Sequence, residues 1–307
     1  MSTFDPDALE CLAAIVEEGG FERAAQRLSI TQSAVSQRLR ALEAQVGTVL
    51  IVRSRPLKAT AAGQLLLKHT KQMRLLRADL ERDIRELAPS SVGGARDEER
   101  VSIAINADSI ATWALGALGD LVRDGLPLEI IVDNQDFTQE WLRQGQVLGC
   151  VTTLKQALRG CKVMPLGAME YIAVCASDAK VRAKLDAKAG LTAHNFRGIP
   201  FIAFNRKDDI QTEFVAKAFG LKHVTLNQVF VPGSEAQVRA AMAGWGISVV
   251  PALIVQPLID DGRLVNIAPQ HHLHVQLYWH CWNLESDVLD NLTAALGAAA
   301  AQQLHRV

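Results

Sequence analysis

One short stretch of the chain, Thr31–Val46, combines a helical apolar stripe with side chains that can bind nucleic-acid bases. Thr31 is a good N-cap residue, and Val35, Leu39 and Leu42 recur at the spacing of one helix face. Glutamine can pair with adenine and arginine with guanine through two hydrogen bonds each, and serine can reach base edges or phosphates. The opposite, nearly acid-free face carries Gln32, Ser33, Ser36, Gln37, Arg38 and Arg40. We therefore predict that this face contacts double-stranded DNA.

Charge is unevenly distributed along the 307 residues. The whole chain has a formal net charge of −1, yet Gly19–Arg77 holds 11 Lys and Arg residues against two acids, a local charge of +9. A solvated surface normally mixes both signs, whereas a one-sided excess in one segment is typical of a module that binds a polyanion. Within this segment, Arg53, Arg55 and Lys58 form a basic turn, which we expect to contact phosphates or the minor groove.

The elements expected around these side chains are short. Helices and one strand are predicted at residues 7–18, 21–28, 31–46 and 49–52. Tightly joined helices let the third one project from the body, so that its N-terminal side chains can enter the major groove. Together with the basic turn, these elements predict a winged helix-turn-helix domain over residues 1–59.

A longer helix is expected from Thr60 to Leu87, because Pro89 and a Ser/Gly-rich joint follow it. Apolar residues recur along it every seven positions at Leu66, Met73, Leu80 and Leu87, with Leu76 and Ile84 alongside. Such a seam favours helix pairing across a two-fold axis, which would let one protein contact two half-sites. Residues 60–96 are therefore predicted to be a dimerising linker helix and hinge of a homodimer or homotetramer. A single amphipathic helix packed on its own domain is the alternative.

The remainder, residues 97–307, alternates strand and helix patterns. Strands are expected at 101–105, 128–132, 148–152, 199–204, 225–229, 247–250 and 275–282. Helices are expected at 110–122, 138–144, 211–218, 235–243 and from about 285 onward. This alternation predicts an α/β domain built from parallel units.

The N-terminal pattern also resembles a known family. The stretch FERAAQRLSITQSAVSQRLRALE, Phe21–Glu43, is similar to the signature of LysR-type transcriptional regulators, and the likeness continues through the wing and the linker helix. In that family the third helix and the wing bind DNA. The resemblance therefore places DNA binding on Gln32, Ser33, Ser36, Gln37, Arg38, Arg53 and Arg55. It also implies a periplasmic-binding-protein-like effector domain with lobe I at about 97–167 and 271–307, and lobe II at about 168–270.

Shorter motifs in the C-terminal half resemble the ArgP branch of this family. They are Asn106–Trp113, Asp208-Asp209, Ser234–Ala236 and Leu277–His280. That branch includes lysine-responsive regulators of basic amino-acid exporters and proteins described as inhibitors of chromosome replication initiation. The resemblance implies a regulator of amino-acid export or metabolism genes with lysine or arginine as effector. A different small carboxylate as effector, or a nucleoid or replication-control protein that needs no effector, are the alternatives.

In folds with two such lobes, ligands bind in the cleft beyond the carboxyl ends of the strands. Two expected strand-to-helix turns, Asn106–Ser109 and Pro232–Ser234, would offer N–H groups to a carboxylate, and nearby acids would bind an ammonium group. The predicted effector-binding residues are Asp108, Ser109, Thr153, Asp208, Ser234 and Glu235. Asp108 is the preferred acid because it adjoins Ser109 beside an anion-binding turn. Either serine can instead simply cap its helix.

No motif in the sequence indicates another class of function. The sequence has no Ser-His-Asp, P-loop or glycine-rich dinucleotide pattern, so we expect neither an enzyme nor a cofactor. His271, His272, His274 and His280 match no zinc spacing, and no metal site is expected. The five cysteines are interpreted as reduced, buried thiols rather than a peroxide-sensing pair. No signal peptide and no apolar run near the ~20 residues of a membrane helix were found, so a cytoplasmic location without membrane contact is expected.

Overall fold

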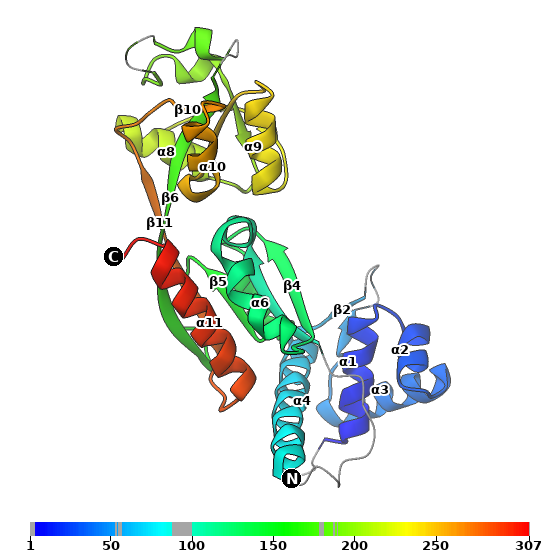
Figure 1. The fold of residues 1–307 in the computed structure, drawn as a ribbon. Coiled ribbons are helices and arrows are strands. Elements are labelled where there is room, and N and C mark those ends of the chain that lie inside the picture. Colours follow the sequence, from blue (N-terminus) through cyan, green and yellow to red (C-terminus); the bar gives the residue numbers. More distant parts are fainter. Residues whose placement is uncertain are drawn as a thin grey trace.

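The structure is a computed structural model that describes residues 4–52, 54, 57–87, 100–177, 181–186, 188 and 190–306, with only the backbone for 85–87. A helical N-terminal domain, one long helix and an α/β domain follow one another along the chain (Figure 1). In the described part of the chain, every helix is too short or too polar to span a bilayer.

The N-terminal domain contains the predicted helices. They are α1 (Pro6–Glu17), α2 (Phe21–Arg27) and α3 (Gln32–Val46). Thr31 caps α3, because its side chain accepts a hydrogen bond from the Ala34 N–H at 3.2 Å. Gly47 ends the helix with a φ of +79°, a left-handed conformation that glycine adopts without strain. The buried face of α3 packs into a core shared with α1, α2 and the wing.

The predicted wing is present as a short antiparallel pair. Strand β1 (Ile51–Val52) pairs with β2 (Lys58–Ala59). The Glu43 carboxylate accepts a hydrogen bond from the Leu50 N–H at 2.9 Å, which ties α3 to the start of the wing. The two arginines predicted to contact phosphates, Arg53 and Arg55, lie outside the described residues.

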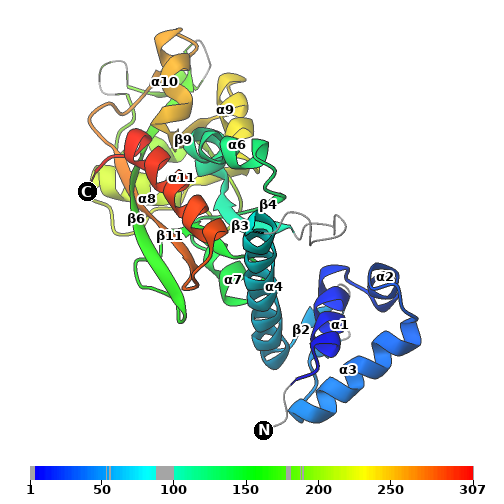
Figure 2. The same ribbon diagram turned by 60° about the horizontal axis from the view of Figure 1, so that its bottom comes forward.

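Helix α4 (Ala61–Leu87) lies between the two domains (Figure 2). Leu67 is buried in the N-terminal core, whereas Leu75, two turns later, is buried in the core of the α/β domain. Leu66, predicted as part of the dimer seam, instead packs against the N-terminal core. The exposed apolar residues of α4 are Leu65, Met73, Leu76, Leu80 and Ile84. Spacings of three, four and eight residues place them on one side of the helix, an apolar stripe exposed to solvent.

The α/β domain is built on one mixed sheet. Its strands are β3 (Val101–Asn106), β4 (Leu128–Asp133), β5 (Gly149–Thr152), β6 (Cys161–Ala176), β7 (Pro200–Ala203), β8 (Asn227–Phe230), β9 (Ile247–Pro251), β10 (Leu264–Asn266) and β11 (Leu273–Trp282). The order is β4-β3-β5-β11-β6-β9-β7-β8, and β10 also pairs with β6. Pairs β3–β4, β3–β5, β7–β8 and β7–β9 are parallel, as predicted.

Two long antiparallel strands, β6 and β11, connect the lobes. Residues 161–171 of β6 pair with β11, and residues 171–176 pair with β9 and β10. Figure 1 shows both strands running from one lobe to the other. Neither β6, with its 16 residues, nor β10 was predicted from the sequence.

Helices cover the sheet in both lobes. They are α5 (Ala107–Ser109), a π-helical turn (Ile110–Ala114), α6 (Leu115–Arg123), α7 (Thr138–Arg143), α8 (Ile210–Phe219), α9 (Ser234–Met242), α10 (Ala252–Asp260) and α11 (Asp287–Gln303), with short 3₁₀ turns at Arg182–Lys184 and Phe196–Gly198. Helix α10 was not predicted, because Pro257 interrupts its pattern. Helix α11 returns to lobe I, as expected, and packs on α6.

Candidate nucleic-acid interface and ligand cavity

The exposed side of α3 presents the predicted polar residues to solvent. Gln32, Ser33, Gln37 and Arg40 are exposed, and Ser36 is partly exposed. Arg38 differs, because its guanidinium forms an ion pair with Asp7 of α1 at 3.0 Å. Its side chain must leave Asp7 before it can reach a base. The amide and hydroxyl groups near the N-terminus of α3 therefore form the accessible part of the predicted interface.

Part of the basic excess of Gly19–Arg77 is balanced by acids of α1 and its C-cap. Arg27 pairs with Glu17 at 2.6 Å and with Glu18 at 3.4 Å. Arg74 of α4 is largely buried and binds both Glu10 and Glu17. A charge count that starts at Gly19 leaves these acids out, since all three precede it in the sequence. Fewer of these cations are therefore available to a polyanion than the local charge of +9 implied.

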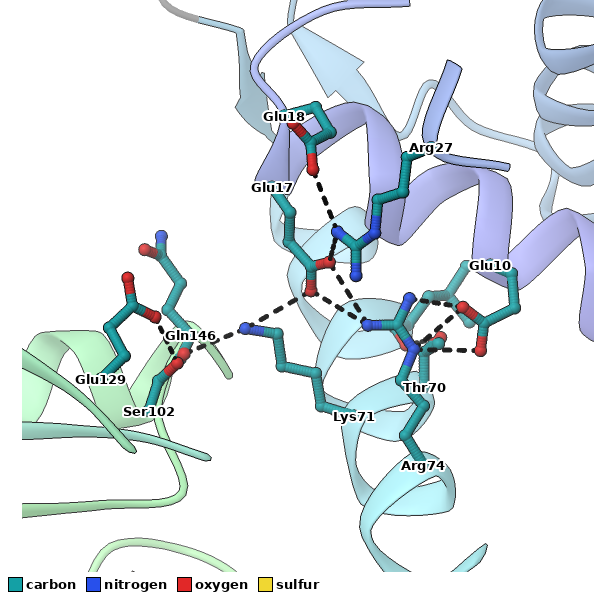
Figure 3. Close-up of polar contacts among 11 residues, drawn as sticks. Glu10, Glu17, Glu18, Arg27, Thr70, Lys71, Arg74, Ser102, Glu129 and Gln146 are labelled. Atoms are coloured by element: carbon teal, nitrogen blue, oxygen red, sulfur yellow. Dashed lines mark hydrogen bonds and ion pairs between the residues drawn. The ribbon is translucent and has the colours of Figure 1, made fainter. Parts of the chain in front are cut away.

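Glu17 is the centre of a polar network that joins three parts of the chain (Figure 3). Its carboxylate binds Arg27 of α2 together with Lys71 and Arg74 of α4. Burial raises the pKa of Glu17, but these three cations outweigh that effect and hold it below its usual value of 4.5. Lys71 also donates to the Gln146 carbonyl oxygen in lobe I at 3.0 Å. The network thus connects the N-terminal domain, the linker helix and the α/β domain.

A cavity lies between the two lobes, beyond the ends of β3, β4 and β7. It encloses about 410 Å³ of empty space, including its opening to solvent. Its lining consists of Asn106, Ala107, Asp108, Asp133, Asn134, Gln135, Tyr171, Phe204, Asp208, Ile210, Gln211, Gln237 and Val249. Among the residues that the structure describes, the lining includes three acids and no lysine or arginine. The cavity therefore suits a cationic ligand.

Asp108 is partly buried and makes hydrogen bonds to side chains on both sides of the cleft. Its carboxylate accepts hydrogen bonds from the Ser234 hydroxyl at 2.5 Å and from the Tyr171 hydroxyl at 2.7 Å. Burial raises the pKa of Asp108; the two hydroxyls lower it, and the nearby Asp208 raises it further. Ser234 begins α9 in lobe II, so its bond to Asp108 spans the cleft. Neither partner carries a positive charge that would neutralise the carboxylate.

The other two acids of the lining have structural partners. Both oxygens of Asp208 accept backbone N–H groups, from Phe204 at 2.8 Å and Ile210 at 3.1 Å, which fixes the turn into α8. Burial also raises the pKa of Asp208. Asp133 accepts the Trp141 indole N–H at 2.9 Å. These two acids therefore contribute negative charge to the cavity while holding its walls in place.

Three predicted effector residues do not reach the cavity. Glu235 is exposed on the outer side of α9, 3.9 Å from Arg239 one turn later. Thr153 donates to Asp136 at 2.5 Å outside the lining residues. Ser109 is fully buried beside Asp108 but is not part of the lining. Within the described residues, its hydroxyl has no hydrogen-bond partner. Ser109 precedes the π-helical turn and Ser234 begins α9, but neither side chain makes a capping hydrogen bond.

Several lining residues were missed. Tyr171, Gln135 and Gln237 were not singled out in the sequence. Asn106 was seen only as a turn residue, yet its side-chain amide is buried with no partner among the described residues. A polar residue at the end of a strand was the available signal for Asn106 and Gln135. Tyr171 gave no such signal, since it lies inside the long strand β6.

The remaining candidate groups are separate from this cavity. The described cysteines are unpaired thiols, as interpreted from the sequence. Burial raises the pKa of Cys150, and it raises the pKa of Cys175 to about 11, although Arg182 opposes this. Such thiols are poor candidates for peroxide sensing. His280 is buried and its Nε2 lies 2.7 Å from the Leu154 carbonyl oxygen, away from His272 and His274.

Comparison with known proteins agrees with both parts of the structure. Residues 6–64 match the model of bacterial regulatory helix-turn-helix proteins of the lysR family, and residues 94–301 match the LysR substrate binding domain. The HTH-type transcriptional regulator ArgP of Aeromonas salmonicida is 41% identical over 286 residues, which cover 93% of each chain.

Solved structures show the same similarity. The crystal structure of ArgP from Mycobacterium tuberculosis has a TM-score of 0.84 and 38% identity and covers 99% of each chain. Full-length LysG from Corynebacterium glutamicum with bound effector Arg has a TM-score of 0.73 and 32% identity, covering 98% of this chain and 99% of that one.

Proposed function

Because this chain belongs to the LysR family of bacterial transcriptional regulators, we propose that it binds operator DNA under the control of a basic amino acid, arginine or lysine, bound between its lobes. The regulated genes in this proposal serve amino-acid export or metabolism. The chain acts as a DNA-binding regulator in the cytoplasm and not as an enzyme.

The observation that carries the effector proposal is the charge of the cavity. Asp108 is partly buried, has no neutralising cation among its described partners, and lines the cavity together with Asp133 and Asp208. A buried carboxylate is stabilised by a cation far more than by neutral hydroxyls. A guanidinium or ammonium group at Asp108 would supply that cation. The arginine bound to the related LysG supports this assignment.

Polar groups in the lining can bind the other end of such a ligand. The Asn106 amide is buried and lacks a partner within the described residues. Gln237 is also buried and lines the cavity from α9 of the opposite lobe. An α-carboxylate between these amides would receive hydrogen bonds from both lobes. A ligand with one anionic and two cationic groups therefore fits the cavity better than a simple carboxylate, which would face three acids.

Isothermal titration with arginine, lysine and citrulline tests the proposal. Citrulline has nearly the shape of arginine but carries a neutral urea group in place of the guanidinium. We expect saturable binding of arginine or lysine and at least tenfold weaker binding of citrulline. Equal affinities for arginine and citrulline, or no binding of either basic amino acid, would contradict the proposal.

We propose that two chains pair through the apolar stripe of α4. Leu65 is 73% exposed and Leu80 is 57% exposed, on a helix whose other side already packs on both domains. A second copy of α4 would cover this stripe and place two α3 helices for two half-sites.

Sedimentation velocity of Leu80→Glu tests this pairing, with Leu115→Glu as a control at an equally exposed site on α6. We expect the α4 variant to shift towards monomer and the control to retain the wild-type oligomeric state. An unchanged oligomeric state in Leu80→Glu would rule out the stripe as the interface.

A further inference from the structure

Histidines that match no zinc motif in the sequence lie together in the structure, with partners from elsewhere in the chain. Glu170 of β6, His274 of β11 and His305 near the C-terminus each offer a ligand atom, and these atoms lie within 4.8 Å of one another. We propose that this cluster, the crossover cluster, binds one divalent transition-metal ion, with zinc as the best fit. The proposal is independent of the effector and of DNA.

Backbone hydrogen bonds hold the three positions together. Glu170 and His274 are direct partners in the antiparallel pairing of β6 with β11. His305 forms a bridge with Ala168, with N–H···O distances of 2.9 and 3.0 Å in the two directions. Ala168 lies two residues before Glu170, so it faces the same side of β6. The three side chains therefore converge because of strand register and not because of a chance rotamer.

Gly167 makes the approach of the C-terminal segment possible. A Cβ atom at this position would lie 2.9 Å from the His305 carbonyl oxygen, and the φ of Gly167 is +130°. Both constraints favour glycine over any other residue. Gly167 in β6 therefore allows the close contact that brings His305 into the crossover cluster.

The donor set matches zinc chemistry. Two imidazoles and one carboxylate form a common three-ligand zinc site with one position left for water. Bond lengths of about 2.0–2.2 Å in a tetrahedron require ligand atoms about 3.4 Å apart. His305 Nε2 is already 3.3 Å from Glu170 Oε2, and His274 Nε2 is 4.0 Å from Glu170 Oε1. Small side-chain rotations would complete the site.

A further histidine contacts the carboxylate of the crossover cluster. His272 Nδ1 lies 2.6 Å from Glu170 Oε1, so His272 can orient this carboxylate as hydrogen-bond donors do around metal ligands. His272 lies directly before β11, two residues from His274. Binding at this site would join the two crossing strands to the C-terminal segment after α11.

Zinc titration of tag-free full-length protein tests the inference. By isothermal titration we expect one zinc ion per chain, and binding at least tenfold weaker in both His274→Gln and His305→Gln. His223→Gln, an exposed histidine outside the cluster, is the matched control and should bind zinc as the wild type does. Absence of saturable zinc binding, or equal weakening in the control, would overturn the proposal.

A second measurement separates metal binding from misfolding. We expect zinc to raise the melting temperature of the wild type and of His223→Gln, and to leave that of His274→Gln and His305→Gln unchanged. Without zinc, all four proteins should have the same circular dichroism spectrum. If zinc raises the melting temperature of the cluster variants as much as that of the wild type, the metal binds elsewhere and the assignment is wrong.

Discussion

Acidic side chains have opposite surroundings in the two halves of the molecule. In the N-terminal half, Glu17 is surrounded by Arg27, Lys71 and Arg74. In the cavity, Asp108 receives hydrogen bonds from neutral hydroxyls alone within the described residues. Burial raises the pKa of both groups, but only at Glu17 do cations reverse the shift. Charge balanced within the chain stabilises the fold, whereas charge left unbalanced in a cavity is available to a ligand.

The largest expected effect is the loss of arginine binding in Asp108→Asn. The amide keeps the shape of the side chain but removes the charge, so arginine affinity should fall by at least ~30-fold, about 2 kcal/mol. The melting temperature of the free protein should not fall, since a buried charge without a cation is also removed. Isothermal titration and thermal unfolding measure the two quantities. Glu235→Gln is the control; an equal loss in both variants would argue against Asp108.

The converse experiment removes a cation from the N-terminal half, where the charge of Glu17 is balanced. Arg74 is largely buried between Glu10 and Glu17, so Arg74→Ala should destabilise the packing of α1 on α4 by about 2 kcal/mol. Faster hydrogen exchange of α1 amides would report this change, with arginine affinity unaltered. Arg143→Ala, which breaks an exposed pair with Glu140, should change stability by less than about 0.5 kcal/mol. Similar effects of the two variants would contradict this interpretation.

A smaller effect is expected on α3. Gln37 is exposed, and Gln37→Ala should weaken binding to a specific operator about tenfold with little change on random DNA. Arg38 is paired with Asp7, so Arg38→Ala should weaken binding to the two DNAs more equally than Gln37→Ala does. Fluorescence anisotropy with both duplexes measures the difference. If Gln37→Ala lowers the affinity for both duplexes equally, Gln37 does not recognise a base.

The pH dependences of the two halves should be distinct. Arginine binds the charged form of Asp108, so its affinity should fall as pH decreases through the raised pKa of this group, by at most tenfold per pH unit. The lowered pKa of Glu17 instead adds stability above the usual value of 4.5, which is lost as pH decreases through the lowered pKa. Titrations at several pH values should show a weaker pH dependence for Asp108→Asn, in which Asp208 is the remaining lining acid of raised pKa. A profile like that of the wild type would exclude Asp108.

Local patterns in the sequence predicted most of the fold. Helices α1, α2, α3 and α4 were placed to within about two residues, because capping residues and apolar periodicity are local signals. Helix α10 was missed at Pro257, and β6 was missed because a strand that crosses two lobes has no single buried face.

The candidate site was predicted only in part. Asp108, Asp208 and Ser234 were identified from their places at the ends of strands, and the structure brings all three to the cleft. Glu235 was wrongly predicted to face the cleft, because adjacent residues of a helix point in different directions. The Ser234 hydroxyl reaches Asp108 in the cleft, whereas the carboxylate of Glu235, the next residue, is exposed to solvent. Tyr171 depends on the packing of β6 beneath the cleft, which no local pattern reveals.

The bond from Ser234 to Asp108 has a consequence for the timing of the response. It joins lobe II to lobe I, so a ligand that binds the Asp108 carboxylate would compete with a contact that the protein already makes with itself. In that mode of binding, only molecules in which Ser234 has released the carboxylate would take up the ligand, and the apparent affinity would equal the intrinsic one multiplied by their fraction. We expect Ser234→Ala to remove this competitor and to make the protein respond at lower effector concentrations. A single hydroxyl would thereby set the threshold of the response.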